Sequence, residues 1–268
     1  MFDNKNWPLN SMLVCRRHRV MFMPIAKNAN TSLKRSFVRL SEHPEQNLIL
    51  AGDVHSYLTS HATGLRLWDY TPDEARSMME DEQYFRFVVL RNPLQRVTSG
   101  YLSKFVMDRQ SAEPHDETPE VIGTAIDWVY ARRNEPPDYE RSITFEEFVD
   151  HVVSNDDEAL DTHFRSQESY LAGLQFNFVG VLEDLRPLVR ELESRFAQSA
   201  FLEHKNVTPR KKIMIGKGGL ANQLPARLRA GKRLATDSQL MTSEIKEKLK
   251  RRFAGDIKLW EEASRSHR

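Results

Sequence analysis

Residues 19–33 read RVMFMPIAKNANTSL, a short apolar run that stops at a proline and passes through a loop of small residues. The run Arg19–Met23 predicts a strand that ends before Pro24. Beyond the loop, apolar residues recur at helical spacing, which predicts a helix over Thr31–Leu40. A strand, a loop and a helix in this order form the repeating unit of a parallel sheet.

The loop has the composition of an anion-binding site. At a helix N-terminus, the first backbone N–H groups and the helix dipole attract a negatively charged group. Asn28 and Asn30 tolerate left-handed backbone conformations, so glycine is not required there. Lys27 adds a positive charge, and Thr31 and Ser32 add hydroxyl donors. The alternative is an ordinary turn between strand and helix, capped by Thr31.

The loop is not the phosphate loop of ATP- and GTP-binding proteins. That pattern requires two glycines and a lysine directly before Ser or Thr. Here Lys27 precedes Thr31 by four positions and both glycines are missing. The sequence therefore disfavours a P-loop kinase that uses ATP and Mg²⁺, which remains the alternative enzyme.

Three further apolar runs predict strands at Leu48–Ala51, Phe85–Leu90 and Phe176–Val181. Helices are expected after 91–93 as far as Phe105, near Val121–Arg132, and over Thr144–Val153, Asp184–Phe196 and Ser243–Phe253, with another beginning at the capping box of Thr71. Strands that alternate with helices predict an α/β fold with three layers, a central, mostly parallel sheet flanked by helices. No linker is visible, so we expect one domain over residues 1–268.

A second segment, residues 90–101, reads LRNPLQRVTSGY. Arg91 follows a predicted strand directly, at the end of the strand where ligands collect in open α/β sheets. Ser99 lies eight residues further on, two turns into the next helix and on the same side as Gln95. An arginine fork and a hydroxyl can together hold a second phosphate. Alternatively, Arg91 caps the strand and Ser99 packs against a neighbour.

Together the two segments resemble the sulfotransferases that use 3′-phosphoadenosine 5′-phosphosulfate (PAPS), above all the carbohydrate branch known as sulfotransferase family 2, with its chondroitin, dermatan and heparan 2-O enzymes. Residues 24–33 resemble its 5′-phosphosulfate loop, of the type Pro-x-x-Lys-x-x-x-Thr-Ser. Residues 91–101 resemble its 3′-phosphate motif. Weaker similarities follow in the same order at 161–167, 178–185 and 253–256, so the resemblance spans most of the chain.

The resemblance implies a P-loop-like fold and in-line transfer of a sulfuryl group from PAPS to a hydroxyl acceptor, without a metal. It implies that Lys27 stabilises charge on the leaving oxygen and that Arg91 and Ser99 hold the 3′-phosphate. The implied residues of the 5′-phosphosulfate site are Lys27, Asn28, Ala29, Asn30, Thr31 and Ser32. A saccharide or glycan is the acceptor that this branch suggests.

Transfer to a hydroxyl benefits from a general base with a pKa near neutrality, which favours histidine. His55 lies just after the predicted strand Leu48–Ala51, where related 2-O enzymes place their catalytic histidine. His61 and His163 remain alternatives, because either could lie across the cleft. A surface histidine with no role in catalysis is the competing interpretation of all three.

The net charge of +1, from 39 Lys and Arg against 38 Asp and Glu, hides an uneven distribution. Residues 108–161 contain 16 acidic and 4 basic residues, and we expect an acidic insertion or lid over about 108–141. Residues 205–233 contain nine basic residues and no acidic one. This basic run could close over the nucleotide, with Arg210 and Lys212 as donor-binding candidates, or bind an anionic polysaccharide.

Composition narrows the remaining classes of function. The basic run contains no aromatic residue on which bases could stack, so nucleic-acid binding is disfavoured. No apolar run approaches the roughly 18 residues of a membrane-spanning helix, and no signal peptide is visible. We therefore expect a cytoplasmic, bacterial protein. The single cysteine, Cys15, excludes a disulfide framework and a cysteine-based zinc site. A non-catalytic, polyanion-binding relative remains open.

Overall fold

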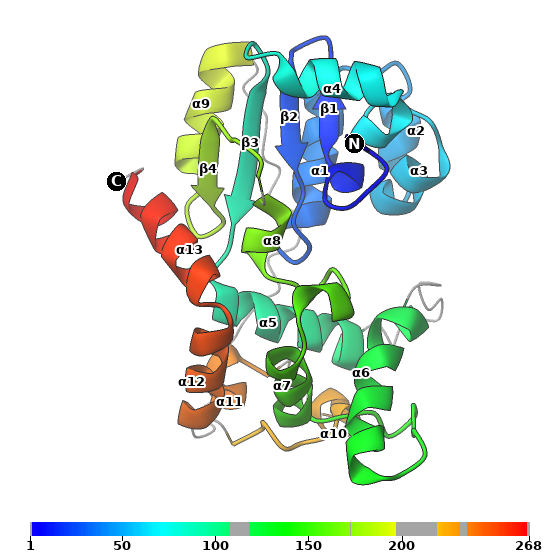
Figure 1. The fold of residues 1–268 in the computed structure, drawn as a ribbon, viewed down its shortest axis with the longest axis vertical. Coiled ribbons are helices and arrows are strands. Elements are labelled where there is room, and N and C mark those ends of the chain that lie inside the picture. Colours follow the sequence, from blue (N-terminus) through cyan, green and yellow to red (C-terminus); the bar gives the residue numbers. More distant parts are fainter. Residues whose placement is uncertain (1, 108–117, 172, 197–218, 231–234, 267–268) are drawn as a thin grey trace. The chain divides into compact units, whose positions relative to one another are not determined.

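The computed structural model describes residues 2–107, 118–171, 173–196, 219–230 and 235–266 (Figure 1). These residues form two compact units. The first unit comprises Met1–Asn92, Gln167–Val207 and Lys258–Arg268, and the second comprises Pro93–Ser166 and Thr208–Ile257. The expectation of a single domain over residues 1–268 stays a prediction.

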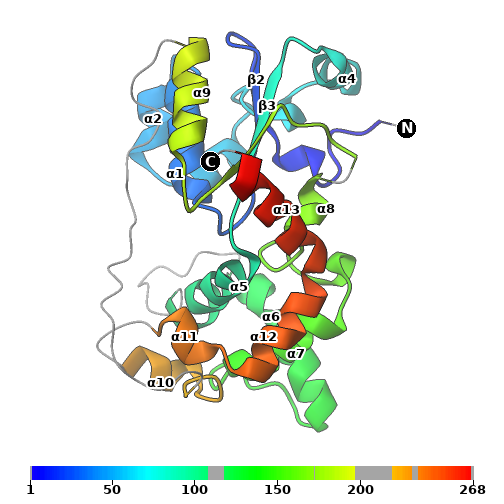
Figure 2. The ribbon, with the colours of Figure 1, turned by 90° about the vertical axis from the view of Figure 1, so that its left-hand side faces the viewer.

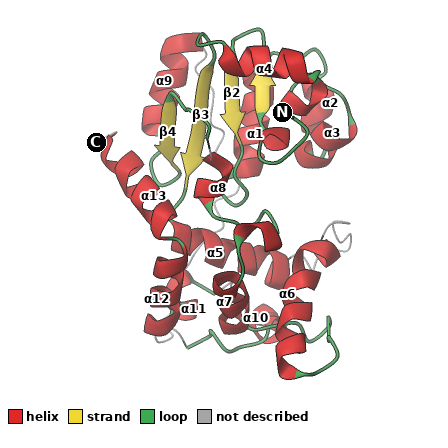
Figure 3. Ribbon diagram, in the orientation of Figure 1, coloured by secondary structure: helices red, strands yellow, loops and turns green. Residues whose placement is uncertain are grey.

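The first unit is built around a four-stranded sheet of order β1-β2-β3-β4 (Figure 3). The edge strand β1 (Leu13–Cys15) runs antiparallel to β2 (Val20–Met23). β2 pairs in parallel with β3 (Phe85–Leu90), and β3 pairs in parallel with β4 (Phe178–Val181). The carboxyl ends of the three parallel strands therefore lie at one edge of the sheet, the edge at which open α/β sheets bind ligands.

Side chains along the strands alternate between two apolar layers, as the period of two in a strand requires. On one face the rings of Phe22 and Phe87 stack 4.8 Å apart, beneath helices α1 (Asn30–Leu40), α2 (Gln46–Ala51), α3 (Val54–Ser60) and α9 (Arg186–Phe196). The opposite face carries Met21 and Val88. It is covered by α4 (Pro72–Glu80), α8 (Gln167–Leu171), the short helices η1 (Leu9–Ser11) and η2 (Leu67–Asp69), and the part of α13 (Ala254–Ser266) that follows residue 257.

Figure 2 shows the strands edge-on, with α1, α2 and α9 on one side and α4 and α8 on the other. The three-layer α/β fold with a mostly parallel sheet is confirmed. Among the predicted strands, Phe85–Leu90 matches β3 at both ends, and the runs at 19–23 and 176–181 contain β2 and β4.

The strand predicted at Leu48–Ala51 is wrong, because these residues form the end of helix α2. Ile49 is the buried residue of this helix, whereas Leu48 is 57% exposed. A run of four apolar residues fits one turn of a buried helix as well as a short strand. The candidate base His55 consequently follows a helix, and it lies in the first turn of the next helix, α3.

In the first unit, α4 begins and α9 ends where the sequence predicts, whereas α9 begins at Arg186 and not at the predicted Asp184. Thr71 and Glu74 form the capping box of α4, and α9 ends at Phe196. The edge strand β1 has no counterpart in the sequence prediction, since three residues carry almost no periodic signal.

The second unit is helical in the part that the structure describes. Its elements are α5 (Pro93–Tyr101), the π-helical segment η3 (Leu102–Met107), α6 (Thr118–Arg133), α7 (Phe145–Ser154), η5 (Asp157–Ala159), α10 (Pro225–Ala230), α11 (Asp237–Leu240), α12 (Ser243–Arg252) and the first turn of α13. The capping box of Thr144 opens α7 as predicted. α12 stops one residue before the predicted end, and α13 continues well past it.

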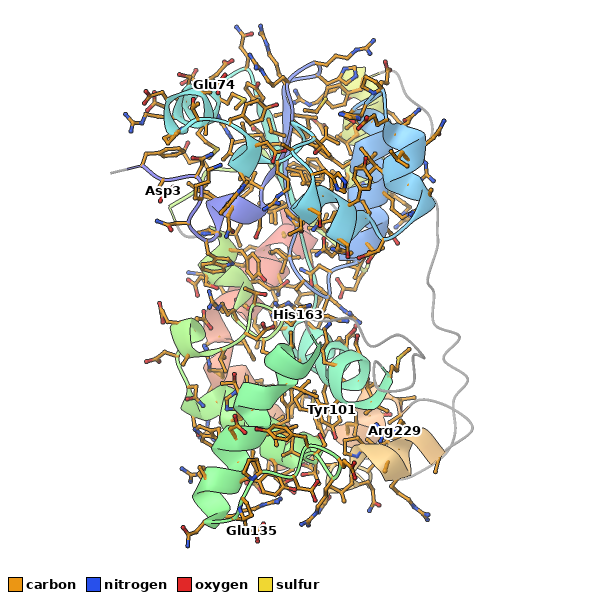
Figure 4. All side chains as sticks on the ribbon, turned by 90° about the vertical axis from the view of Figure 1, so that its right-hand side faces the viewer. Asp3, Glu74, Tyr101, Glu135, His163 and Arg229 are labelled. Atoms are coloured by element: carbon orange, nitrogen blue, oxygen red, sulfur yellow. The ribbon has the colours of Figure 1, made fainter. Side chains whose placement is uncertain are left out.

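An aromatic cluster forms the core of the second unit. The ring of Tyr101 packs within 5.5 Å of those of Phe105 and Phe148, and its hydroxyl donates to the Ile143 carbonyl at 3.0 Å. Burial raises the pKa of Tyr101 far above its usual value. Figure 4 labels Tyr101 together with Arg229 of α10, which donates to the Phe105 carbonyl at 3.2 Å. Tyr101, part of the 90–101 segment, is thus a core residue of its unit.

The described part of the acidic segment, from residue 118 onward, begins with α6, which is longer than the helix predicted at Val121–Arg132. One side of this helix, including Ile122 and Ile126, is buried in the core of the second unit. Of the basic run, residues 205–218 and 231–233 lie outside the described residues, Arg210 and Lys212 among them. No helix in the described part of the chain is long and apolar enough to cross a membrane.

A buried histidine in the second unit predicts a pH-dependent stability. Burial lowers the pKa of His151 to about 4, and the Asn155 side-chain amide donates to its Nδ1 at 3.2 Å. In the unfolded chain the same side chain titrates near 6.5, so acid favours unfolding below that pH. We expect the free energy of unfolding to fall by up to about 3 kcal/mol as the pH drops from about 6.5 to 4.

The measurement is urea unfolding at a series of pH values on the parent and on His151→Phe, which should lose this part of the pH dependence. His61→Gln, at an exposed position, is the matched control. Equal pH slopes for parent and His151→Phe would contradict the assignment.

Candidate functional site

The loop between β2 and α1 has an unusual backbone. Lys27 has φ +70° and Ala29, the N-cap of α1, has φ +55°, so both adopt the left-handed conformation. The sequence suggested Asn28 and Asn30 for left-handed conformations. In the structure these conformations occur instead at Lys27, which precedes Asn28, and at Ala29, which lies between the two asparagines. Left-handed non-glycine residues are costly and concentrate at functional sites, where the surrounding structure enforces them.

Asn28 is the residue that enforces this loop. It is buried, and its backbone N–H donates to the Ile25 carbonyl at 3.2 Å. Its side-chain nitrogen donates to the Val89 carbonyl of β3 at 2.9 Å and to Oε1 of Gln167 at 2.6 Å. Both kinds of N–H donor on Asn28 are thus engaged within the protein. We expect Asn28 to shape the anion site, and the ligand to be bound by other groups of the loop.

Gln167, the first residue of α8, is a site residue that sequence reasoning missed. Its side chain is fully buried. Besides the bond from Asn28, its Oε1 accepts the N–H of Arg91 at 3.0 Å, and its Nε2 donates to the Arg91 carbonyl at 2.9 Å. The one signal for it was its place at the end of the 161–167 similarity, since an uncharged amide suggests no chemistry by itself.

Arg91 directly follows β3, as predicted, and it also lies against the loop. Its Nη1 donates to the Lys27 carbonyl at 2.8 Å. The next residue, Asn92, donates its backbone N–H to Glu183 at 2.9 Å, and Glu183 also accepts from the indole N–H of Trp260 at 3.0 Å. The end of β3 is therefore fixed from the side of the loop and from the side of β4.

His55 lies beside the first turn of α1. Its Nε2 is 2.8 Å from the hydroxyl oxygen of Thr31, and its Nδ1 is 3.2 Å from Nζ of Lys34. Since a lysine ammonium can only donate, Nδ1 acts as the acceptor in this arrangement, and Nε2 of the neutral ring carries the proton and donates to Thr31. The hydrogen of the Thr31 hydroxyl can then point to another acceptor.

Asp53 fixes the start of α3 and with it the position of His55. Its carboxylate accepts the backbone N–H groups of His55 and Ser56 at 3.2 and 3.0 Å, and the Ser56 hydroxyl at 2.7 Å. Burial acts to raise the pKa of Asp53, but the hydrogen bonds from Ser56 and His55 outweigh it and hold the pKa below its usual value. The cap is therefore ionised at neutral pH.

The two alternative histidines belong to different units. His61 is at the far end of α3, where its ring stacks on Tyr57 at 4.1 Å. His163, labelled in Figure 4, belongs to the second unit, and its Nδ1 is 2.7 Å from the Asp161 carboxylate. Burial acts to raise the pKa of Asp161, yet the hydrogen bond and charge of His163 keep it below its usual value.

The remaining candidates are not joined to this site by the structure. Ser99 lies in α5 of the second unit, so its pairing with Arg91 stays a prediction. Arg210 and Lys212 lie outside the described residues. What the first unit does bring together is the loop of residues 24–30, the first turns of α1, Arg91 and His55.

This arrangement favours an anion. Residues 24–40 contain four basic residues and no acidic one. The first N–H groups of α1 point out of the helix at its positive dipole end. The Arg91 guanidinium and the Thr31 and Ser32 hydroxyls add donors around the same loop. A phosphate or sulfate ester fits such a set of donors.

Comparison with known proteins agrees with this chemistry. Human carbohydrate sulfotransferase 14 is 26% identical over 179 residues, covering 66% of this chain and 44% of the relative. Carbohydrate sulfotransferase 10 of Pongo abelii is 29% identical over 161 residues (58% and 41%), and carbohydrate sulfotransferase 12 of Xenopus laevis is 25% identical over 211 residues (68% and 47%). The chain thus spans under half the length of these relatives.

No solved structure gives a significant match to the chain. A model of the sulfotransferase family, in contrast, matches residues 10–261, a span that begins before β1 and ends within α13. Because this match covers nearly the whole chain, the protein belongs to the sulfotransferase family.

Proposed function

We propose that the protein transfers the sulfuryl group of PAPS to a hydroxyl group of a carbohydrate. The observation that carries this proposal is the conformation of the loop of residues 24–30. Lys27 and Ala29 have left-handed backbone conformations just before α1, and the Lys27 carbonyl accepts a hydrogen bond from Arg91. Membership of the sulfotransferase family implies PAPS as the donor. The carbohydrate acceptor is supported by the names of the relatives.

The donor has two anionic ends, and the first unit supplies a group for each. Lys27, the hydroxyls of Thr31 and Ser32 and the first N–H groups of α1 would bind the 5′-phosphosulfate. Arg91 would bind the 3′-phosphate. Sulfuryl transfer resembles phosphoryl transfer, in which catalysis comes mainly from positioning and from charge stabilisation. Lys27 would stabilise the negative charge that develops on the leaving oxygen.

We propose His55 as the general base for the acceptor hydroxyl. Its support is proximity, because its ring contacts Thr31 in the first turn of α1, whereas His61 lies at the opposite end of α3. To accept a proton, His55 must present a free lone pair, so one ring nitrogen has to exchange its present partner when the substrates bind. Lys34, which donates to Nδ1, is the partner that an anionic donor would attract away.

His55→Ala should lower kcat by at least about 100-fold, as loss of a general base typically does. The dissociation constant of 3′,5′-adenosine bisphosphate (PAP) should stay within about threefold of the parent value, and added imidazole should restore part of the turnover. Steady-state kinetics and calorimetry measure these quantities. His61→Ala is the matched control and should retain full activity. Undiminished turnover in His55→Ala removes His55 from the mechanism.

Ligand binding distinguishes the proposed donor from ATP. PAP at 100 times its dissociation constant should stabilise the protein by about 2.7 kcal/mol, since it binds the folded state alone. We expect the melting temperature to rise with PAP, and to change little with ATP·Mg²⁺, which has no 3′-phosphate for Arg91. A thermal-shift titration measures both. Stabilisation by ATP·Mg²⁺ and none by PAP would favour the P-loop kinase.

A further inference from the structure

We propose that Gln167 is a positioning residue that fixes the position of Arg91 relative to the loop of residues 24–30, called the donor loop below. This fixed spacing lets the protein select a nucleotide with both a 5′- and a 3′-phosphate. The inference rests on the proposed function. It adds a residue that touches neither phosphate in the proposed binding mode.

The side-chain amide of Gln167 uses both of its ends. Its Oε1 accepts two hydrogen bonds, from the side chain of Asn28 at 2.6 Å and from the backbone N–H of Arg91 at 3.0 Å. Its Nε2 donates to the carbonyl of the same Arg91 at 2.9 Å. One side chain thus holds a loop residue and both backbone polar groups of the residue that ends β3.

These contacts close into a ring within the first unit. From Gln167 the ring runs to Asn28, along the chain to Lys27, from the Lys27 carbonyl to the Arg91 guanidinium at 2.8 Å, and back through the Arg91 backbone to Gln167. Asn28 is also fixed to the Val89 carbonyl at 2.9 Å. A shift of the loop therefore changes the position of the Arg91 side chain, and a shift of Arg91 changes the position of the loop.

Burial makes the hydrogen bonds of this ring costly to lose. Gln167 is 0% exposed and Asn28 is 1% exposed, so water does not readily replace a lost bond. An ionised glutamate at this position could still accept from Asn28 and Arg91, but it could not donate to the Arg91 carbonyl, and it would add a negative charge. A methionine has similar volume and makes none of the three bonds. The two substitutions remove one bond or all three while changing the shape little.

The test compares Gln167→Glu and Gln167→Met with the parent, using PAP and AMP as probes in calorimetry. AMP carries the 5′-phosphate alone, so it needs the loop but not the fixed relation to Arg91. We expect the dissociation constant of PAP to rise at least about tenfold in Gln167→Met, and that of AMP to change by less than about threefold. KM for PAPS should rise by a larger factor than kcat falls.

Gln239 provides the matched control. It is a buried glutamine of the second unit, 3% exposed, whose Oε1 accepts from the backbone N–H of Thr236. Gln239→Met should lower the melting temperature and leave the ratio of PAP to AMP affinity unchanged. A purely structural Gln167 would behave in the same way.

The proposal is overturned if the ratio of PAP to AMP affinity in the Gln167 variants stays within about threefold of the parent ratio. Should Gln167→Met fail to fold, the same criterion is applied to Gln167→Glu, which keeps two of the three bonds. If the parent binds PAP no better than AMP, the proposed function fails together with this inference. If the parent prefers PAP and the variants keep that preference, the role of Gln167 alone is rejected.

Discussion

The buried side chain of Asn28 joins the loop after β2 to the last residues of β3, and the geometry of the first unit's site depends on that bond. The sheet places the two segments at one edge, but it does not set the conformation of the loop. Hydrogen bonds from an amide that is removed from water hold Lys27 and Ala29 in a backbone conformation that neither would choose alone. These hydrogen bonds pre-organise the loop before any ligand binds.

The same site shows a division between charge and hydrogen bonding. The cationic groups lie at the partly exposed margin of the loop, whereas the uncharged amides of Asn28 and Gln167 are buried. Burying these groups is tolerable because the side-chain nitrogen of Asn28 and both ends of the Gln167 amide find partners, whereas a buried lysine or arginine would need a counter-charge.

Local signals made much of the fold predictable. The strands around Phe22 and Phe87 are short apolar runs bounded by turn residues, and the capping boxes of Thr71 and Thr144 are read within four residues. The strand at Leu48–Ala51 failed because so short a run has no distinguishing period. Lys27 and Arg91 were proposed from their charge, their place after a strand and the family resemblance, and His55 from the pKa of histidine and that resemblance; their roles stay predictions. Gln167 was missed as a site residue because its importance lies in contacts with residues far away in the chain.

Arg91 and Gln167 are hydrogen-bonded neighbours although 76 positions separate them in the chain. The chain leaves the first unit directly after Asn92 and returns to it at Gln167. The residues at which the chain leaves and re-enters the first unit are thus hydrogen-bonded to each other. Chain ends that lie close together are typical of positions that tolerate an inserted sequence. Changes in the intervening residues 93–166 that keep Ser99 and the helical core of the second unit are therefore expected to pass little strain to the loop of residues 24–30.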